Sequence, residues 1–155
     1  MGQHSEGEAE REFELGRKAL DVDDFEAALV HLEAALELKD DPCWYSYVGY
    51  CIARGRGEFG TGVALCLMSL EVEQENPVHY LNLGKVFLAS GNKKKALLTF
   101  RDGLAKGGNE EILQMLVEFG TRNTPVFKSL PRSNPLNKFL GNLLHRHALR
   151  KRDVP

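Results

Sequence analysis

Few residues in this 155-residue sequence have the types and spacing that catalysis or metal binding requires. The sequence has no Ser, Cys or Thr in a nucleophile motif, no HExxH motif and no glycine loop of the phosphate-binding type. His145 and His147 are two residues apart on an expected helix, so their side chains point to different sides and do not form a metal site. The sequence therefore predicts a protein that is not an enzyme and that holds no metal or cofactor.

The three cysteines, Cys43, Cys51 and Cys66, also lack the spacing of a reactive site. No two of them form a C-x-x-C motif, and their number is odd. We expect reduced, partly buried thiols, as in cytosolic proteins. The glycine-rich stretch 55–62 follows an expected helix rather than a strand, so we interpret it as a loose turn and a candidate hinge. The acidic residues in 21–26 lack the ligand spacing of a calcium loop.

Charge is distributed unevenly along the chain. Residues 1–77 contain 17 acidic and 6 basic residues, a net charge of −11, whereas residues 78–155 contain 5 acidic and 14 basic residues, a net charge of +9. This asymmetry can steer charged partners, and it is compatible with a salt-sensitive, head-to-tail self-association. No apolar run approaches the roughly 20 residues of a membrane-spanning helix, and the acidic N-terminus lacks the order of a secretory signal. We therefore expect a cytoplasmic protein.

Helices are the elements that would position any functional side chain. Between residues 80 and 106, apolar residues recur at three and four residues in two segments separated by Gly91-Asn92, which predicts a helical hairpin. The pattern also occurs earlier in the chain, at a constant step of 34 residues. The series that share this step are Phe25, Phe59 and Lys93; Ala28, Gly62 and Ala96; Leu32, Cys66 and Phe100; and Leu36, Leu70 and Leu104. Three such hairpins predict an all-α solenoid.

The hairpin at 80–106 resembles a tetratricopeptide repeat, whose family period of about 34 residues equals this step. The residues that carry the motif are Tyr80, Leu83, Gly84, Phe87, Ala96 and Phe100. The resemblance implies a right-handed superhelical solenoid of antiparallel helix pairs that binds another protein. The expected domain limits are a disordered N-terminus at 1–8, a repeat region at 9–120 with helix pairs at 9–42, 43–76 and 77–108 and a capping helix at 110–119, and a C-terminal arm at 121–155.

In this family the first helices line an inner wall that binds a peptide or a helix of the partner. The resemblance places the lining side chains three residues before, one after and four after the glycine of each first helix. The implied partner-binding residues are Phe13, Arg17, Ser46, Tyr50, Leu81, Lys85 and Leu88, together with Leu20 and Ala53. An apolar peptide could have a carboxylate or phosphate clasped by Arg17 or Lys85. The alternatives are packing residues for Leu20, Ala53 and Leu88, and solvated surface charges for the two cations.

The arm at 121–155 is rich in proline and is expected to end in an amphipathic, basic helix at 135–150. Its apolar residues are Phe127, Leu136, Phe139, Leu140 and Leu143. The arm could pack on the protein's own groove or cap, bind a partner helix, or lie on an anionic membrane. The favoured function is an adaptor or scaffold, and the alternative is a chaperone or membrane-associated assembly factor that uses the arm. Nucleic acid is not an expected partner, because the basic cluster is short and lacks interleaved aromatic residues.

Overall fold

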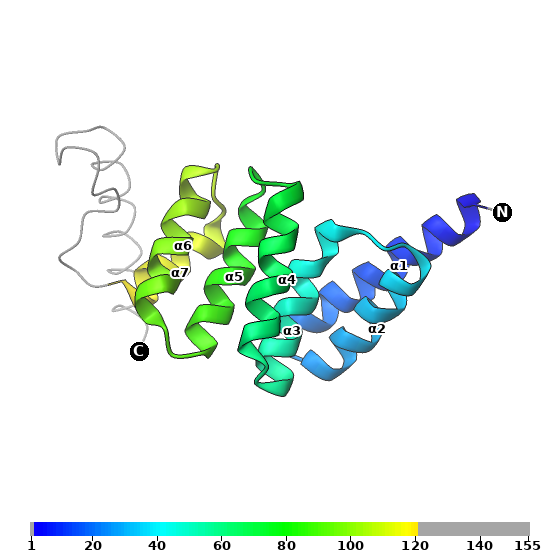
Figure 1. Ribbon diagram of the computed structural model, residues 1–155, viewed down its shortest axis with the longest axis horizontal. Helices are drawn as coiled ribbons and strands as arrows, with labels where there is room; N and C mark the ends of the chain where they lie inside the picture. Colours follow the sequence, from blue (N-terminus) through cyan, green and yellow to red (C-terminus); the bar gives the residue numbers. More distant parts are fainter. Residues whose placement is uncertain (1, 121–155) are drawn as a thin grey trace, which may run out of the picture.

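The computed structural model describes residues 2–120 (Figure 1). Within this range the chain forms α-helices and one short 3-10 helix, and it has no strand. The elements in chain order are α1 (Gly2–Asp21), α2 (Phe25–Leu38), η1 (Pro42–Trp44), α3 (Tyr45–Arg56), α4 (Phe59–Val72), α5 (Pro77–Ala89), α6 (Lys93–Ala105) and α7 (Glu110–Phe119). The predicted all-α repeat fold is confirmed. The predicted arm, with its helix at 135–150, lies outside the described residues.

The helices form three antiparallel pairs, α1/α2, α3/α4 and α5/α6, followed by the single helix α7. Each pair packs within itself and against the next helix along the chain, so the pairs follow one another along the long axis of the molecule (Figure 1). Such an arrangement depends on contacts between neighbours in the sequence. Between Gly2 and Gly120, no helix is both long enough and apolar enough to cross a membrane.

Short polar residues begin several of the helices. The side chains of Asp24, Asn92 and Asn109 each accept a hydrogen bond from a backbone N–H three residues further on, at the starts of α2, α6 and α7. Gly91 ends the turn after α5 with a φ of 78°, a left-handed conformation that glycine adopts without steric cost. These local signals are the ones that the sequence carries at its predicted helix boundaries.

Two of the four series that recur at the repeat step lie on the buried side of the second helices. Their residues are Ala28, Leu32, Gly62, Cys66, Ala96 and Phe100, and all are buried. Gly84 on α5 faces Phe100 on α6, and an added Cβ on the glycine would stand 2.2 Å from Cε1 of the ring. The helix spacing in the third pair therefore requires a residue without a side chain at position 84.

The N-terminus differs from the prediction of a disordered segment at 1–8. Helix α1 begins at Gly2, and Ala9 is its first fully buried residue. Residues 6–8 are exposed, so they continue the helix without contributing to the core. Their sequence contains Glu6 and Glu8, which are good helix formers, and extending an existing helix costs far less free energy than starting one. The polar composition of this segment did not indicate that extension.

Candidate functional site

The described chain has a groove lined by α1, α3, α5 and α7, with a volume of about 940 Å³. We call this feature the groove. Helices α2, α4 and α6 contribute no residue to its lining. The first helices of the pairs therefore form one wall, and α7 extends that wall beyond the third pair.

The groove combines apolar side chains with charges of both signs. Leu20, Leu81 and Leu88 supply aliphatic surface from α1 and α5, and Met115 and Phe119 add to it from α7. The charged lining residues are the cations Arg17, Arg54 and Lys85 and the carboxylates Asp21, Asp23, Glu111 and Glu118. An apolar surface that is edged by charge is a common property of sites that bind protein segments.

The structure brings five of the seven predicted partner-binding residues to the groove. These residues are Arg17, Tyr50, Leu81, Lys85 and Leu88. Phe13 instead stacks on Trp44 with ring centroids 4.7 Å apart and meets the ring of Tyr47 edge-on at 5.0 Å. Ser46 has no exposed surface, and it does not line the groove. Of the two further positions, Leu20 lines the groove and Ala53 is buried.

Phe13 and Ser46 occupy the same position in their helices. Both stand three residues before the glycine of a first helix, and in the first two pairs this position faces the neighbouring helices, whereas its equivalent in the third pair, Leu81, lines the groove. The groove is reached from the next residue along, which is Tyr47 on α3 and Asn82 on α5. One residue on a helix corresponds to a rotation of about 100°, so a shift of one position moves a side chain from the open side to the interior.

Helix α7 supplies further lining residues that the sequence pattern did not predict. The sequence predicts that the helix at 110–119 caps the third pair, and Ile112 and Leu116 are buried against that pair. The same helix turns Glu111, Met115 and Glu118 toward the groove. A helix of strong amphipathic character at the end of a solenoid is the signal that could have suggested this second role.

The groove cations already have partners in the chain. Lys85 forms an ion pair with Glu111 on α7, and its ammonium lies 5.0 Å from the centre of the Tyr50 ring. Arg17 pairs with Glu14 one turn earlier, at 2.7 Å. The guanidinium of Arg54 lies 5.1 Å from the centre of the Phe25 ring. Pairs as exposed as Arg17–Glu14 are worth only about 0–1 kcal/mol each, so a ligand can exchange them at little cost.

Solved structures of other proteins share the fold of these helix pairs. The Arabidopsis OM64 TPR domain matches with a TM-score of 0.55 at 16% identity, over 92% of this chain and 98% of that one. The Sgt2 TPR domain from Aspergillus fumigatus matches with a TM-score of 0.59 at 13% identity, over 84% of this chain and 93% of that one. The chain has a tetratricopeptide-repeat fold. No model of a protein family matches the sequence.

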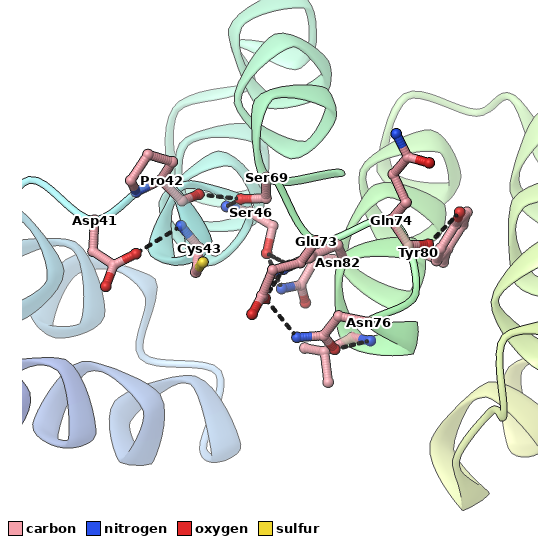
Figure 2. Close-up of polar contacts among 12 residues, drawn as sticks. Asp41, Pro42, Cys43, Ser46, Ser69, Glu73, Gln74, Asn76, Tyr80 and Asn82 are labelled. Carbon is pink, nitrogen blue, oxygen red and sulfur yellow. Dashed lines mark hydrogen bonds and ion pairs between the residues drawn. The ribbon is translucent and has the colours of Figure 1, made fainter. Parts of the chain in front are cut away.

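Beside the groove of this tetratricopeptide-repeat fold lies a buried polar network that joins the second and third pairs (Figure 2). The Ser46 hydroxyl on α3 lies 2.8 Å from Nδ1 of His79 on α5, and Nε2 of His79 lies 2.8 Å from the Glu73 carboxylate. The Asn82 amide donates to the Ser46 hydroxyl at 3.0 Å, and the Ser46 N–H donates to the Ser69 hydroxyl at 2.8 Å. We call these five residues the buried polar network.

The order of serine, histidine and carboxylate in this network is also that of a hydrolase triad. Ser46 and His79 are 0% and 1% exposed, however, so no substrate reaches the serine hydroxyl. With Nε2 donating to the carboxylate, Nδ1 is the acceptor and the serine hydroxyl donates to it. Hydrogen bonds from Asn76 and His79 lower the pKa of Glu73. The network satisfies buried polar atoms at a repeat junction, which is a structural function.

The three thiols are placed as poor nucleophiles. Burial raises the pKa of Cys51 and of Cys66 to about 12, and burial together with the Asp41 hydrogen bond raises the pKa of Cys43 to about 11. All three are free thiols. In the part of the chain from 2 to 120, no group of three or more His, Cys, Asp or Glu residues is placed to hold a metal ion.

Proposed function

We propose that the chain is a non-catalytic adaptor or scaffold of the cytoplasm that holds one segment of another protein in the groove. The observation that supports this most directly is the groove itself. Its volume is about 940 Å³, and aliphatic, aromatic and charged side chains from four helices line it. A segment that adopts a helical or extended conformation could lie along it and bury its apolar side chains against α5 and α7. The tetratricopeptide-repeat fold agrees with such an interaction module.

The charges of the groove favour a partner segment that is apolar and basic. Among the described residues, Asp21, Asp23 and Glu118 have no ion-pair partner, whereas Arg17 and Lys85 each have one. A carboxylate or phosphate on the ligand would have to displace Glu14 or Glu111 before it met Arg17 or Lys85, whereas Arg54 contacts the Phe25 ring and would meet it without losing an ion pair. A lysine or arginine on the ligand would meet unpaired carboxylates at the edge of the groove. The sequence suggested a ligand with a carboxylate or phosphate. We instead propose a partner segment in which apolar residues are flanked by lysine or arginine.

A peptide library displayed on phage and selected against the full chain tests this proposal. We expect the selected peptides to combine leucine-like and aromatic residues with lysine or arginine. Their affinity should fall at least about tenfold for Leu88→Glu, which places a charge on the apolar wall, and for Glu118→Arg, which reverses an edge charge. The matched controls are Leu38→Glu and Glu8→Arg, since both positions are exposed and neither lines the groove.

Fluorescence anisotropy with one labelled peptide measures these affinities. Circular dichroism of each variant separates a loss of binding from a loss of fold, and Glu118 is exposed, so its reversal leaves the core intact. Peptides that bind Leu88→Glu and Glu118→Arg as well as the wild-type chain would show that the groove is not the binding site. Selected peptides rich in Asp and Glu would refute the proposed charge preference.

A further inference from the structure

The outward side of α4 carries exposed apolar side chains. Leu67, Met68 and Val72 keep 48%, 44% and 57% of their surface exposed. The helix contains no charged residue from Phe59 to Leu70. A surface helix normally presents polar side chains to solvent, and an exposed apolar patch on a folded chain usually marks a contact with another molecule.

This outward side is separate from the groove and from the core. The buried side of α4 is formed by Gly62, Cys66 and Ser69, and no residue of α4 lines the groove. Gly60, Ala64, Leu67, Met68 and Glu71 are exposed, at steps of one, three or four residues, so they form one stripe along the helix. We call these five residues the α4 stripe.

The second helices of the first and third pairs, α2 and α6, have opposite charges. Glu26 on α2 and Lys94 on α6 occupy the positions equivalent to Gly60 in the first and third repeats, and both are exposed. Helix α2 has three glutamates and no lysine or arginine, whereas α6 has four lysines and arginines and one aspartate. At the equivalents of Ala64, Val30 is 62% exposed and Leu98 is 48% exposed. The outer face is therefore acidic along α2, apolar along α4 and basic along α6.

Such a face is complementary to a second copy of itself in one orientation. When two identical faces meet about a two-fold axis that runs along α4, α4 meets its own copy in parallel and α2 of each copy lies over α6 of the other. Glu26 then faces Lys94 of the second copy, and Val30 faces Leu98. An axis that runs across α4 instead places acid over acid and base over base, which is unfavourable. Closed two-fold dimers are also the commonest assemblies of identical chains.

We propose that a second copy of this chain binds to the α4 stripe, with the two-fold axis along α4. Leu67 and Met68 form the apolar centre of the contact, and the α2 and α6 charges on either side set the orientation. Glu71 is the only charged residue of the stripe, and it faces its own copy at the last turn of α4. Because the two carboxylates repel each other, the helices are closest at the opposite end, near Gly60. The groove lies on the odd-numbered helices, so this contact leaves it free and does not depend on what it binds.

Sedimentation equilibrium of the full chain tests the apolar centre. We expect a monomer–dimer equilibrium, and Leu67→Glu should raise the dimer dissociation constant at least about tenfold because it places two glutamates at the centre of the contact. The matched control is Val22→Glu, since Val22 is 74% exposed in the turn between α1 and α2, outside the stripe. A chain that stays monomeric up to millimolar concentration, or a dimer that Leu67→Glu leaves unchanged, would overturn the proposal.

Charge reversal tests the orientation. Glu26→Lys and Lys94→Glu should each weaken the dimer, since each places like charges opposite one another twice. An equal mixture of the two variants should recover the wild-type affinity, because the mixed dimer restores both opposite pairs. In about 0.5 M NaCl, where the Debye length is about 4 Å, these differences should become small. Single reversals that leave the dissociation constant unchanged would contradict the orientation along α4.

A cysteine at position 60 gives a second test of the orientation. Gly60 is exposed and an added Cβ would meet no atom within 4 Å, so Gly60→Cys should fold normally. In the parallel arrangement this residue lies beside its own copy, and mild oxidation should give a disulfide-linked dimer in a Cys43→Ser background. Ala105→Cys on α6 is the control that should not cross-link to itself. Efficient cross-linking at 105 but not at 60 would refute the proposed axis.

Discussion

The replacement Gly84→Ala tests how closely the third helix pair is packed. An added methyl on Gly84 would stand 2.2, 2.5 and 2.8 Å from three carbons of the Phe100 ring. Carbon atoms in contact normally lie about 3.5–4.0 Å apart, so the ring would have to move by about 1.5 Å. Phe100 is completely buried among Leu81 and Ala96, so it has no open space to enter.

The expected loss of stability follows from two opposing terms. Overpacking of a filled core costs about 1–3 kcal/mol, and replacing glycine by alanine in a helix returns about 1 kcal/mol. The free energy of unfolding should therefore fall by about 0–2 kcal/mol. With a denaturant slope of about 1–2 kcal/mol/M in urea, the midpoint should move down by up to roughly 1 M. Gly60→Ala is the matched control, since its methyl meets nothing within 4 Å and should be neutral or slightly stabilising.

Urea denaturation followed by circular dichroism measures both variants. A double variant with Phe100→Leu makes the test more specific, because the smaller side chain gives the new methyl room. The double variant should lose at least about 0.5 kcal/mol less than the sum of the two single losses. Additive losses, or a Gly84→Ala variant as stable as Gly60→Ala, would refute the argument that this contact sets the helix spacing.

Two further predictions concern the buried polar network and the thiols. Because the pKa of Glu73 is lowered in the folded chain, its carboxylate stabilises the fold above the unfolded pKa near 4.5 and stops doing so as the pH falls through the folded value. Glu73→Gln should therefore lower the free energy of unfolding by no more than about 1 kcal/mol at pH 7, since the side chain is 42% exposed. The difference in unfolding free energy from wild type should shrink towards pH 4. A difference that is constant with pH would contradict this. Cys51 and Cys66, with pKa values of about 12, should react with iodoacetamide at pH 8 roughly a thousandfold more slowly than a solvent-exposed thiol of ordinary pKa, because a correspondingly smaller fraction is thiolate. Mass spectrometry of native and urea-unfolded protein measures this rate, and rapid native labelling of either residue would show that its burial is transient.

The fold could be predicted from the sequence because a repeat fold is encoded locally. The alternation of apolar residues within each hairpin and the equal steps from Leu32 to Cys66 and Phe100 involve only neighbouring segments, and all three residues are buried as the periodicity requires. Helix starts at Asp24, Asn92 and Asn109 follow from capping chemistry that is visible in the sequence.

The groove could be predicted only in part, because its lining depends on helix rotation. Arg17 and Lys85 line the groove, but a rotation of one residue separates the buried Ser46 from Tyr47, which also lines it. The sequence also does not show that Ser46 would find His79 and Asn82, which are more than thirty positions away. A polar residue on a first helix can equally face a ligand or a buried partner, and only the packing of the repeats decides between them.

The two junctions between helix pairs are chemically different, and this difference fixes the order of the repeats. The first junction has an aromatic contact, with Phe13 between Trp44 and Tyr47, whereas the second has hydrogen bonds between Ser46 and both His79 and Asn82. If the second and third pairs were exchanged by recombination, Ser46 and His79 would be buried without each other, at a cost of about 1–3 kcal/mol for each unpaired group. Duplication of a whole pair would meet the same obstacle. Solenoids are often regarded as modular, with repeats that can be exchanged or added. In this chain we expect such changes to cost stability, so its three repeats form one unit with a defined first, middle and last member.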